Sequence, residues 1–518
     1  MDVRNSTRKI EFGDFQTPTD LANRICDMLS GKGLRPYSIV EPTCGEGNLL
    51  LAALERFPSA ARVIGVDISH EHIERAQKRL TTRSYADKTQ LFQGDFFEIK
   101  WGEILDGLPD PVLVIGHPPW VTSAELARLN STNLPNRSNF HGLSGLDART
   151  GKSNFDISEW MLIHILDLLS GRDATMAMLC KTRVARQVLV YAWKRKLPLG
   201  FSRMYLIDAA EVFDASVDAC LLVCGATESK GEGQICQVYQ GISGGRYQTT
   251  FGYRDARLVA DMDCYERWKH LEDVNPYRWR SGIKHDCASV MELAREEGGF
   301  RNKFGELYDL ETRYMYPMLK SSDVANESAP LPSRWMLVTQ TFIGKDTTCI
   351  KSIAPKTWDY LMGHSDLFDK RQSSVYKGKP PFSIFGVGEY SFAPWKVAIS
   401  GLYKRLHFAI VGPFAGKPVV LDDTCYFLPC QSEDEARYLA GLLNSTAAAE
   451  FFRAFIFWDA KRPITVGVLN RLSLLALARE LDSEDVLLKF LSASGSGVPP
   501  RQLALFEMQE GHIYEFRR

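Results

Sequence analysis

The residues best suited to chemistry lie in Gly116–Trp120, directly after the apolar run Pro111–Ile115. A short β-branched run that ends in two prolines is typical of a buried parallel strand that stops at the carboxyl edge of a sheet, where open α/β sheets bind ligands. Pro118 and Pro119 have no N–H to donate, so this segment presents carbonyl acceptors, and Trp120 adds an aromatic face. Acceptors beside a stacking surface suit a flat ring that carries an amino group.

A second candidate is a glycine-containing turn between an expected strand and an expected helix. The strand is Ser38–Glu41, the turn is Pro42–Asn48, and the helix is Leu49–Arg56. Gly45 and Gly47 allow a tight turn and a close approach of a ligand, and the helix start adds amide donors. The spacing matches neither the dinucleotide fingerprint nor the phosphate-binding loop of nucleoside triphosphatases, which argues against those two ligand classes.

Acidic residues end the next two expected strands. Asp67 follows Arg62–Val66 and is placed to accept hydrogen bonds from ribose hydroxyls. Asp95 follows Gln90–Phe92 and could accept from an exocyclic amine, while Phe96 packs against a purine face. Each acid alone is commoner as a cap or turn residue. Three strand ends that carry these groups in this order are more specific than any one of them.

The remaining elements must hold these loops at one edge of a sheet. Apolar periodicity predicts helices and strands in alternation, as in an α/β fold. The loop Phe12–Asp20 leads into a helix over Leu21–Leu29, with Thr19 or Asp20 as its N-cap, and a long polar loop covers Val121–Lys152. The other expected elements are the helices Glu71–Leu80 and Ile157–Leu169, the second capped within Ser153–Asp156, and the strands Thr175–Leu179, Met204–Ile207 and Ala219–Val223.

Taken in order, these motifs resemble those of class I S-adenosylmethionine-dependent methyltransferases, and more narrowly the gamma-class N6-adenine DNA methyltransferases of the Taq type. The segments that carry the resemblance are Gln16–Pro18, Glu41–Gly47, Asp67, Gly94–Phe96 and Pro118–Trp120. The resemblance implies an α/β fold: a Rossmann-like, mostly parallel, seven-stranded sheet flanked by helices. It also implies methyl transfer from S-adenosyl-L-methionine to N6 of an adenine that is flipped out of duplex DNA.

The resemblance further assigns roles to individual residues. The residues it implies at the cofactor are Thr17, Glu41, Pro42, Gly45, Gly47, Asp67, Asp95 and Phe96. Gly45, Asp67 and Asp95 would contact the methionine moiety, the ribose and the adenine, and Thr17 would help to close over the cofactor. The catalytic residues would be His117, Pro118, Pro119 and Trp120. Phe213 would stack on the extruded base opposite Trp120; the alternative is that Phe213 is an ordinary core residue.

His117 departs from the family pattern, which has Asn, Asp or Ser at this position. A neutral imidazole has one acceptor nitrogen and could replace the usual acceptor. Its ring is larger, so the acceptor would lie at a different distance from the backbone. Two interpretations of the chain therefore stay open: an active enzyme, and a catalytically impaired, methyltransferase-like DNA-binding subunit. If the imidazole acts as acceptor, methylation should fall as pH drops through its titration, about 6.5 for an unperturbed histidine.

A change in composition divides the chain into a catalytic domain over 1–250 and an α+β target-recognition domain over 251–518. The stretch Gly225–Gly245 is rich in glycine, serine and charge. Beyond it, basic and aromatic residues interleave, as suits phosphate and base contacts. These residues are Tyr277, Arg278, Trp279, Arg280, Lys284, Arg301, Lys303, Arg313, Tyr314, Lys370, Arg371, Tyr376, Lys377, Lys379, Tyr390, Trp395 and Lys396, and Lys181 and Arg183 are further candidate DNA contacts in the first domain.

Composition limits the partners and the compartment. The net charge is −1, so double-stranded DNA must be met by a local basic cleft. The 11 cysteines form no CxxC pair, and no metal-ligand spacing, signal segment or membrane-spanning run is evident, which favours a cytoplasmic protein without a metal. No nuclease motif is evident, which leaves a separately encoded restriction endonuclease as a partner. Methylation of RNA or of a protein glutamine is the rival activity, but such enzymes generally lack so large a carboxyl-terminal region.

Overall fold

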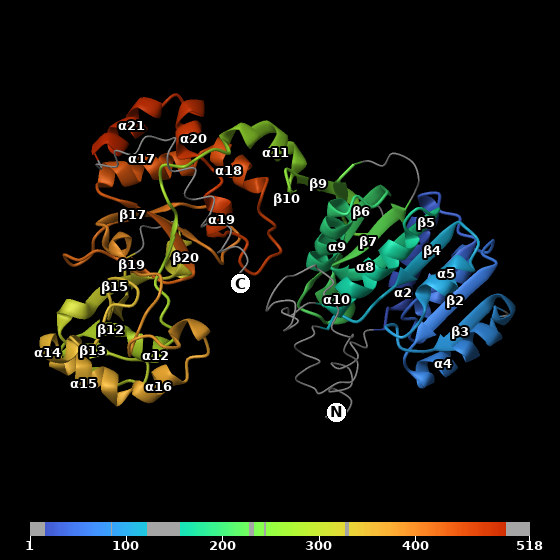
Figure 1. Cartoon of the computed structure of the whole chain (residues 1–518), viewed down its shortest axis with the longest axis horizontal. Helices are drawn as coiled ribbons and strands as arrows, with labels where there is room; N and C mark the ends of the chain where they lie inside the picture. Colours follow the sequence, from blue (N-terminus) through green and yellow to red (C-terminus); the bar gives the residue numbers. More distant parts are fainter. Residues whose placement is uncertain are drawn as a thin grey trace. The chain divides into compact units, whose positions relative to one another are not determined.

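The computed structural model describes residues 16–83, 85–121, 156–226, 233–242, 245–326 and 331–493. The chain divides into two compact units, Met1–Met262 and Asp263–Arg518 (Figure 1). Nearly all of the expected polar loop, the first residues of the N-terminal loop and residues 153–155 of the expected helix cap lie outside the described residues.

The first unit is built on a ten-stranded sheet with the order β10-β9-β8-β6-β7-β5-β4-β1-β2-β3. The strands are β1 (Ser38–Glu41), β2 (Arg62–Asp67), β3 (Thr89–Gln93), β4 (Val112–Gly116), β5 (Ala174–Lys181), β6 (Leu199–Asp208), β7 (Asp218–Ala226), β8 (Ile235–Gln240), β9 (Arg246–Arg254) and β10 (Arg257–Val259). The strands from β3 to β5 are parallel to one another, and β7 runs antiparallel to both β5 and β6. The expected seven-stranded, mostly parallel sheet is confirmed, and β8, β9 and β10 extend it beyond β6.

Helices cover both faces of this sheet (Figure 1). They are α2 (Thr19–Gly31), α3 (Asn48–Arg56), α4 (His70–Thr82), α5 (Trp101–Asp106), α8 (Ile157–Leu169), α9 (Thr182–Lys194) and α10 (Ala209–Phe213), with a 3-10 turn at Ala86–Lys88. Buried side chains of α2, α3 and α4 share one core cluster with alternate residues of the central strands. The N-cap of α2 is Pro18, with no side-chain cap hydrogen bond, so the expectation of Thr19 or Asp20 at that position is wrong.

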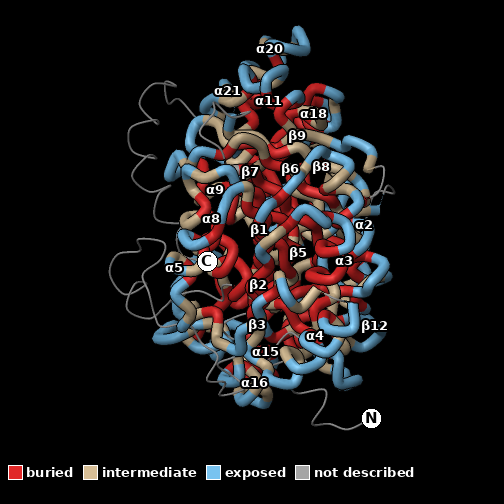
Figure 2. Tube along the Cα trace, turned by 90° about the vertical axis from the view of Figure 1, so that its right-hand side faces the viewer, coloured by how far each residue is buried: buried red, intermediate tan, exposed pale blue. Residues whose placement is uncertain are grey.

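The central strands are the most deeply buried part of the unit (Figure 2). All residues of β1 and β4 are buried. A parallel strand covered by helices on both faces must be apolar at successive positions, which is why these segments read as continuous apolar runs. The two strands pair directly, with Ile39 opposite Leu113 and Val40 opposite Val114. The loops that follow β1 and β4 therefore emerge side by side at the carboxyl edge of the sheet.

The second unit contains two largely antiparallel sheets, ordered β11-β20-β17-β18 and β14-β13-β12-β16-β15-β19. The strands are β11 (Arg280–Ser281), β12 (Glu292–Glu296), β13 (Gly299–Arg301), β14 (Leu307–Tyr308), β15 (Met315–Leu319), β16 (Arg334–Leu337), β17 (Trp395–Ser400), β18 (Ala409–Val411), β19 (Val420–Leu421) and β20 (Cys425–Cys430). The helices that begin in or next to this unit are α11 (Met262–Trp268), α12 (Ala288–Met291), α13 (Ser321–Val324), α14 (Ile350–Ile353), α15 (Pro355–Gly363), α16 (Ser365–Asp369), α17 (Glu433–Leu443), α18 (Thr446–Arg453), α19 (Val466–Leu469), α20 (Leu474–Glu480) and α21 (Glu484–Ala493). The expected α+β character of the carboxyl-terminal half is confirmed.

The expected division at residue 250 falls inside β9, which pairs with β8 along most of its length. The first unit instead ends at Met262, after β10. All 11 cysteines are free thiols, and all but Cys349 are buried. Among the described residues, no helix has the length and apolar character needed to cross a membrane, and no cluster of metal-ligating side chains occurs.

Candidate active site

The end of β4 and the start of the loop after β1 lie close together, and a side chain at Gly116 would be tightly packed between them. A Cβ atom on Gly116 would lie 3.2 Å from the sulfur of Met178 and 3.4 Å from Cδ of Pro42. Gly116 is the last residue of β4, and Pro42 directly follows β1. The structure therefore brings the expected catalytic segment and the expected cofactor turn into direct contact.

His117 lies within a small aromatic cluster at this edge. The centroid of its ring is 4.8 Å from that of Trp120 and 4.9 Å from that of Phe213. Trp120 and Phe213 also meet edge to face, with centroids 5.3 Å apart and planes at 82°. Thr17, which lies 100 residues earlier in the sequence, also reaches this cluster, and its hydroxyl lies 3.1 Å from Nδ1 of His117. Thr17, expected at the cofactor, thus lies next to the expected catalytic residues His117 and Trp120 and next to Phe213.

Burial sets the protonation state of this histidine. It lowers the pKa of His117 from its ordinary 6.5 to about 3. Desolvation disfavours the charged imidazolium, so the ring is neutral throughout the physiological range. The condition of an unperturbed histidine, for which a titration near 6.5 was expected, is therefore not met, because the half-buried ring packs against Trp120 and Phe213 and desolvation disfavours the cation.

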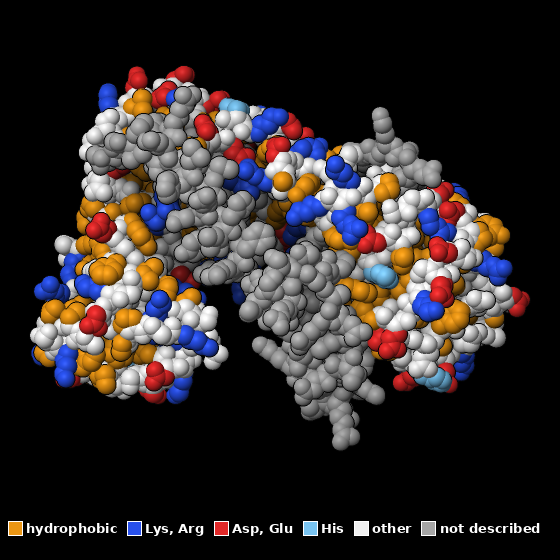
Figure 3. Space-filling model, viewed as in Figure 1, with side chains coloured by type: hydrophobic (Ala, Val, Ile, Leu, Met, Phe, Trp, Pro, Cys, Tyr) orange, Lys and Arg blue, Asp and Glu red, His pale blue; other side chains and the backbone are white. Residues whose placement is uncertain are grey.

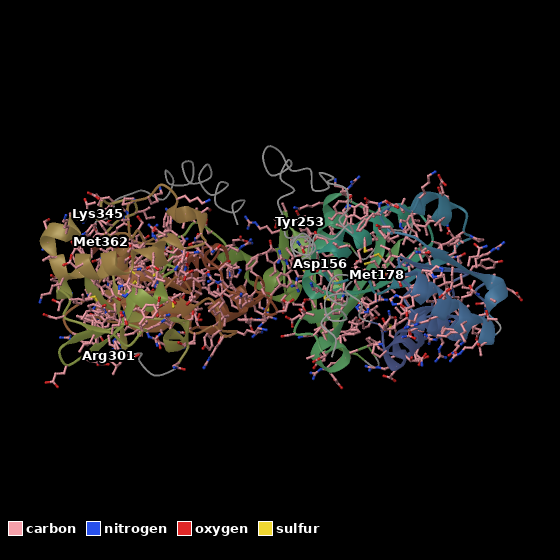
Figure 4. The ribbon with its side chains drawn as sticks, turned by 90° about the horizontal axis from the view of Figure 1, so that it is seen from below. Asp156, Met178, Tyr253, Arg301, Lys345 and Met362 are labelled. Atoms are coloured by element: carbon pink, nitrogen blue, oxygen red, sulfur yellow. The ribbon has the colours of Figure 1, made fainter. Side chains whose placement is uncertain are left out.

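A set of connected hydrogen bonds holds Trp120 in place. Its indole Nε1–H donates to the carbonyl of Leu179 at 3.4 Å, and its own carbonyl accepts from Nζ of Lys181 at 3.0 Å. Lys181 also donates to Asp156 at 2.7 Å, and Asp156 caps α8 by accepting from the amide of Ser158 at 3.1 Å. Lys181, an expected DNA contact, is thus committed to internal partners. Asp156 lies in the same unit as Met178 (Figure 4).

The turn after β1 is shaped by left-handed glycines and by carboxylates. Gly45 has φ +49° and Gly47, the N-cap of α3, has φ +80°. Glu41 is buried and accepts from the amide of Leu50 at 3.0 Å, and burial raises its pKa well above the ordinary value. Asp67 accepts from the amide of Gly45 at 2.8 Å. Two of the acidic residues expected at the cofactor therefore also support the turn itself.

The segment after β3 is folded back on itself. Asp95 accepts from the amide of Phe97 at 2.9 Å. Phe96 is only 5% exposed, and its ring packs at 5.1 Å from Trp101 and 6.2 Å from His164. The contacts of Phe96 in this structure are with other aromatic side chains, and its role at a purine face stays a prediction.

Comparisons with known proteins place this arrangement in a family. The profile of the family described as "Methyltransferase domain" matches residues 39–129. The Type II methyltransferase M.NspV of Nostoc sp. is 43% identical over 472 residues, which cover 91% of this chain and 98% of that protein. The chain belongs to the Type II methyltransferases.

The fold of this Type II methyltransferase is also found in a solved structure of the Type IIL restriction-modification enzyme MmeI in complex with DNA. The TM-score is 0.54 at 14% sequence identity, over 97% of this chain and 78% of that one. The expected class I methyltransferase fold is confirmed, and the cofactor of this methyltransferase is S-adenosyl-L-methionine.

The turn of this methyltransferase has chemistry that fits its cofactor. Oγ1 of Thr43 is buried and has no hydrogen-bond partner among the described residues. A buried hydroxyl without a partner costs about 1–3 kcal/mol, so a ligand that bonds to it would relieve that cost. Ile68, next to Asp67, is 41% exposed and offers an apolar surface. The Thr43 hydroxyl and the apolar surface of Ile68 together suit a ligand with a hydrogen-bonding group and a flat ring.

Sequence reasoning missed the side chains that join the N-terminal segment to this turn. Nδ2 of Asn48 donates to the carbonyl of Thr17 at 2.7 Å. Arg79 donates to the carbonyl of Glu46 and to Oδ1 of Asn48, both at 2.7 Å. Nδ1 of His72 lies 3.3 Å from Asp67. The position of Asn48 directly after the second glycine was the available signal; nothing in the spacing of Arg79 or His72 marks them.

Several of the expected basic and aromatic contacts in the second unit are internal. Trp279 is 2% exposed, and Arg371 stacks on Tyr376 at 3.7 Å from the ring centroid and donates to the carbonyl of Ser383. Lys396 is buried, and desolvation lowers its pKa to about 7. The members that remain exposed are Arg278, Lys303, Arg313, Lys370, Lys377 and Lys379. Basic and acidic side chains are interspersed over the visible faces of both units (Figure 3).

Proposed function

We propose that this methyltransferase transfers a methyl group from S-adenosyl-L-methionine to N6 of adenine in a specific duplex DNA site. The observation that carries the proposal is the neutral imidazole of His117 at the end of β4, in contact with Trp120 and Phe213. Aromatic faces beside a hydrogen-bond acceptor suit an aromatic ring that carries an amino group. The likeness to the Taq-type motifs supports adenine as that ring.

Residues of the chain would prepare the amino nitrogen for attack. The remaining ring nitrogen of His117 and the carbonyl of Pro118 would accept the two N6 hydrogens and turn the nitrogen lone pair toward the methyl group. When bound, the cofactor supplies a sulfonium methyl group, whose S–C bond breaks as the N6–C bond forms. An imidazole with a pKa of about 3 is a poor base, so His117 would hold a hydrogen bond while the surplus N6 proton leaves to water.

Entry of a base requires a rearrangement of the aromatic cluster. In the structure, Trp120 and Phe213 contact each other and the imidazole, and they are 7% and 8% exposed. A base stacked on Trp120 would take the place that Phe213 or the ring of His117 now fills. Flipping costs a few kcal/mol, and stacking returns about 1–3 kcal/mol per base.

The carboxyl-terminal unit would select the DNA sequence. The exposed basic residues Arg278, Arg313, Lys377 and Lys379 are candidates for phosphate contacts. The MmeI structure, which covers nearly the whole of this chain, was determined with DNA, which supports DNA as the substrate. We place the enzyme in a cytoplasmic restriction-modification system with a separately encoded endonuclease.

The deciding experiment is methyl transfer from labelled S-adenosyl-L-methionine to duplex DNA that contains many sequences, followed by digestion to nucleosides and mass spectrometry. We expect N6-methyladenine at one sequence. Methylcytosine, or label only in RNA or protein, would contradict the proposal. If only His117→Asn incorporates label, the natural chain is the impaired DNA-binding subunit that the departure at this position left open.

A further inference from the structure

The hydrogen bond between Thr17 and His117 joins two segments that are 100 residues apart. Thr17 is 5% exposed and is itself held to the glycine turn, since its carbonyl accepts from Asn48 at 2.7 Å. The neighbouring Gln16 accepts from the amide of Glu46 at 3.2 Å. Thr17 is therefore fixed from the cofactor side, and its hydroxyl reaches the ring that the proposed reaction uses.

A neutral imidazole carries one proton, so the bond at Nδ1 decides what Nε2 can do. If the Thr17 hydroxyl donates to Nδ1, the proton is on Nε2, and Nε2 can only donate. If Nδ1–H donates to the hydroxyl oxygen, Nε2 has a free lone pair and can accept. Nε2 makes no hydrogen bond to the described residues of the first unit.

We propose that Thr17 is a positioning residue that accepts a hydrogen bond from Nδ1–H of His117 and thereby leaves Nε2 as the acceptor for the substrate amino group. This inference rests on the proposed function of the same site. The amino group of the substrate offers hydrogens to an acceptor, and only the tautomer with the proton on Nδ1 leaves a lone pair on Nε2 to receive one. The ring is also held at a fixed angle between Trp120 and Phe213, so that the lone pair of Nε2 has one direction.

This role differs from that of a cofactor contact. A residue that only binds the cofactor changes the cofactor affinity and leaves turnover at saturation intact. A residue that sets the tautomer of His117 changes turnover, because the acceptor matters most as positive charge develops on the nitrogen. The two roles therefore separate in the kinetics of the same variant.

The first measurement reads the tautomer directly. The full chain is labelled with ¹⁵N-histidine, and the resonances of residue 117 are assigned by their loss in His117→Asn. We expect Nδ1 in the protonated, pyrrole-type range and Nε2 in the unprotonated, pyridine-type range. The reverse assignment would overturn the inference. Because this readout needs neither DNA nor turnover, it stands even if the adenine assay fails.

The second measurement uses Thr17→Val, which keeps the shape and removes the hydroxyl, and Thr17→Ser, which restores it. We expect turnover of Thr17→Val to fall about tenfold to a hundredfold, the range found for partners that orient a metal-bound histidine. Its Km for DNA and its Kd for cofactor should stay within about twofold, and Thr17→Ser should recover most of the rate. The tautomer signal of residue 117 should shift in the valine variant and return with serine.

A matched control is Thr82→Val on α4, whose exposed hydroxyl bonds only to the carbonyl of Lys78. It should leave turnover and the His117 resonances unchanged. If Thr17→Val weakens cofactor binding but turns over normally at saturation, Thr17 is a cofactor contact and the inference fails. If the natural chain shows the expected tautomer but methylates no adenine, the proposed function fails while the assignment of the hydrogen bond stands.

Discussion

The imidazole of His117 is enclosed by Trp120, Phe213 and the Thr17 hydroxyl, and this enclosure lowers its pKa to about 3. The Asn, Asp or Ser that the resemblance implies at this position needs no such protection to stay an acceptor. A histidine does, because a protonated ring has no lone pair to offer. The surrounding rings therefore make an unusual residue usable at physiological pH.

We expect the methylation rate to show no acid limb from this group between pH 8 and pH 5. A ring with a pKa of about 3 stays neutral over that whole range, so the number of competent enzymes does not change. Single-turnover rates with saturating cofactor and DNA measure this directly. His117→Asn should give a profile of the same shape. A limb near pH 6.5 that disappears in the asparagine variant would contradict the low pKa.

The same group contributes to stability in a defined direction. The pKa of His117 is lower in the folded chain than in the unfolded chain, so the unfolded chain takes up the proton first as pH falls. The stability that a neutral His117 contributes is complete above about pH 6.5 and declines toward pH 3.

At the scale of single elements, the start of α8 combines a helix cap with an ion pair. Asp156 accepts from the amide and the hydroxyl of Ser158 and pairs with Lys181, which in turn bonds to the carbonyl of Trp120. A helix terminus that is remote in sequence from the double-proline segment thus fixes the tryptophan. The carboxylate of this ion pair is largely shielded from water, since the Asp156 side chain is 8% accessible.

We expect Asp156→Ala to destabilise the chain by about 2–4 kcal/mol, because it removes the cap and leaves Lys181 without its carboxylate. Asp156→Asn keeps a cap oxygen and should cost less. Thermal unfolding gives the stability, and tryptophan fluorescence should report altered surroundings of Trp120. Ser445→Ala, which removes an ordinary cap from α18, is the control and should cost about 1 kcal/mol. Equal losses in Asp156→Ala and Ser445→Ala would mean that the ion pair contributes nothing.

Sequence patterns predicted most elements of the first unit because burial there is local and periodic. Ser38–Glu41 and Ile157–Leu169 have the expected bounds, since the first ends at the Pro42 turn and the second is a strongly apolar stretch that ends at Ser170-Gly171. β8 was missed because the stretch around it is rich in glycine and charge, and its pairing with β6 is a long-range property. The same reason explains Lys181: its partner Asp156 is 25 residues away, and only the fold brings the two together.

The whole molecule consists of two units, and the first carries every residue of the candidate site. Its sheet continues through β9 and β10, so a division at residue 250 would cut β9 after only four of its residues have paired with β8. We expect a fragment 1–262 to fold and to bind S-adenosyl-L-methionine with the affinity of the full chain. A fragment 1–250 should melt at a lower temperature, because it loses part of β9 and all of β10.

Circular dichroism on heating and calorimetric titration with the cofactor test both fragments. Neither should select a DNA sequence, if the second unit carries recognition. Equal melting temperatures for the two fragments would show that the end of β9 adds nothing to the sheet. Site-selective methylation by the fragment 1–262 would contradict the assignment of recognition to the carboxyl-terminal unit.

The outermost strand of the large sheet has a consequence for self-association. An exposed sheet edge offers unpaired backbone groups to another chain, and short, charged edge strands limit this risk. β10 spans only three residues, begins with the exposed Arg257, and follows a turn in which Asp255 and Ala256 both have positive φ. β8 and β9 cover β6, a ten-residue strand that would otherwise be a long exposed edge strand with unpaired backbone groups. Removing the three added strands would therefore leave the backbone groups of β6 open to pairing with another chain, and we expect such a truncated chain to aggregate.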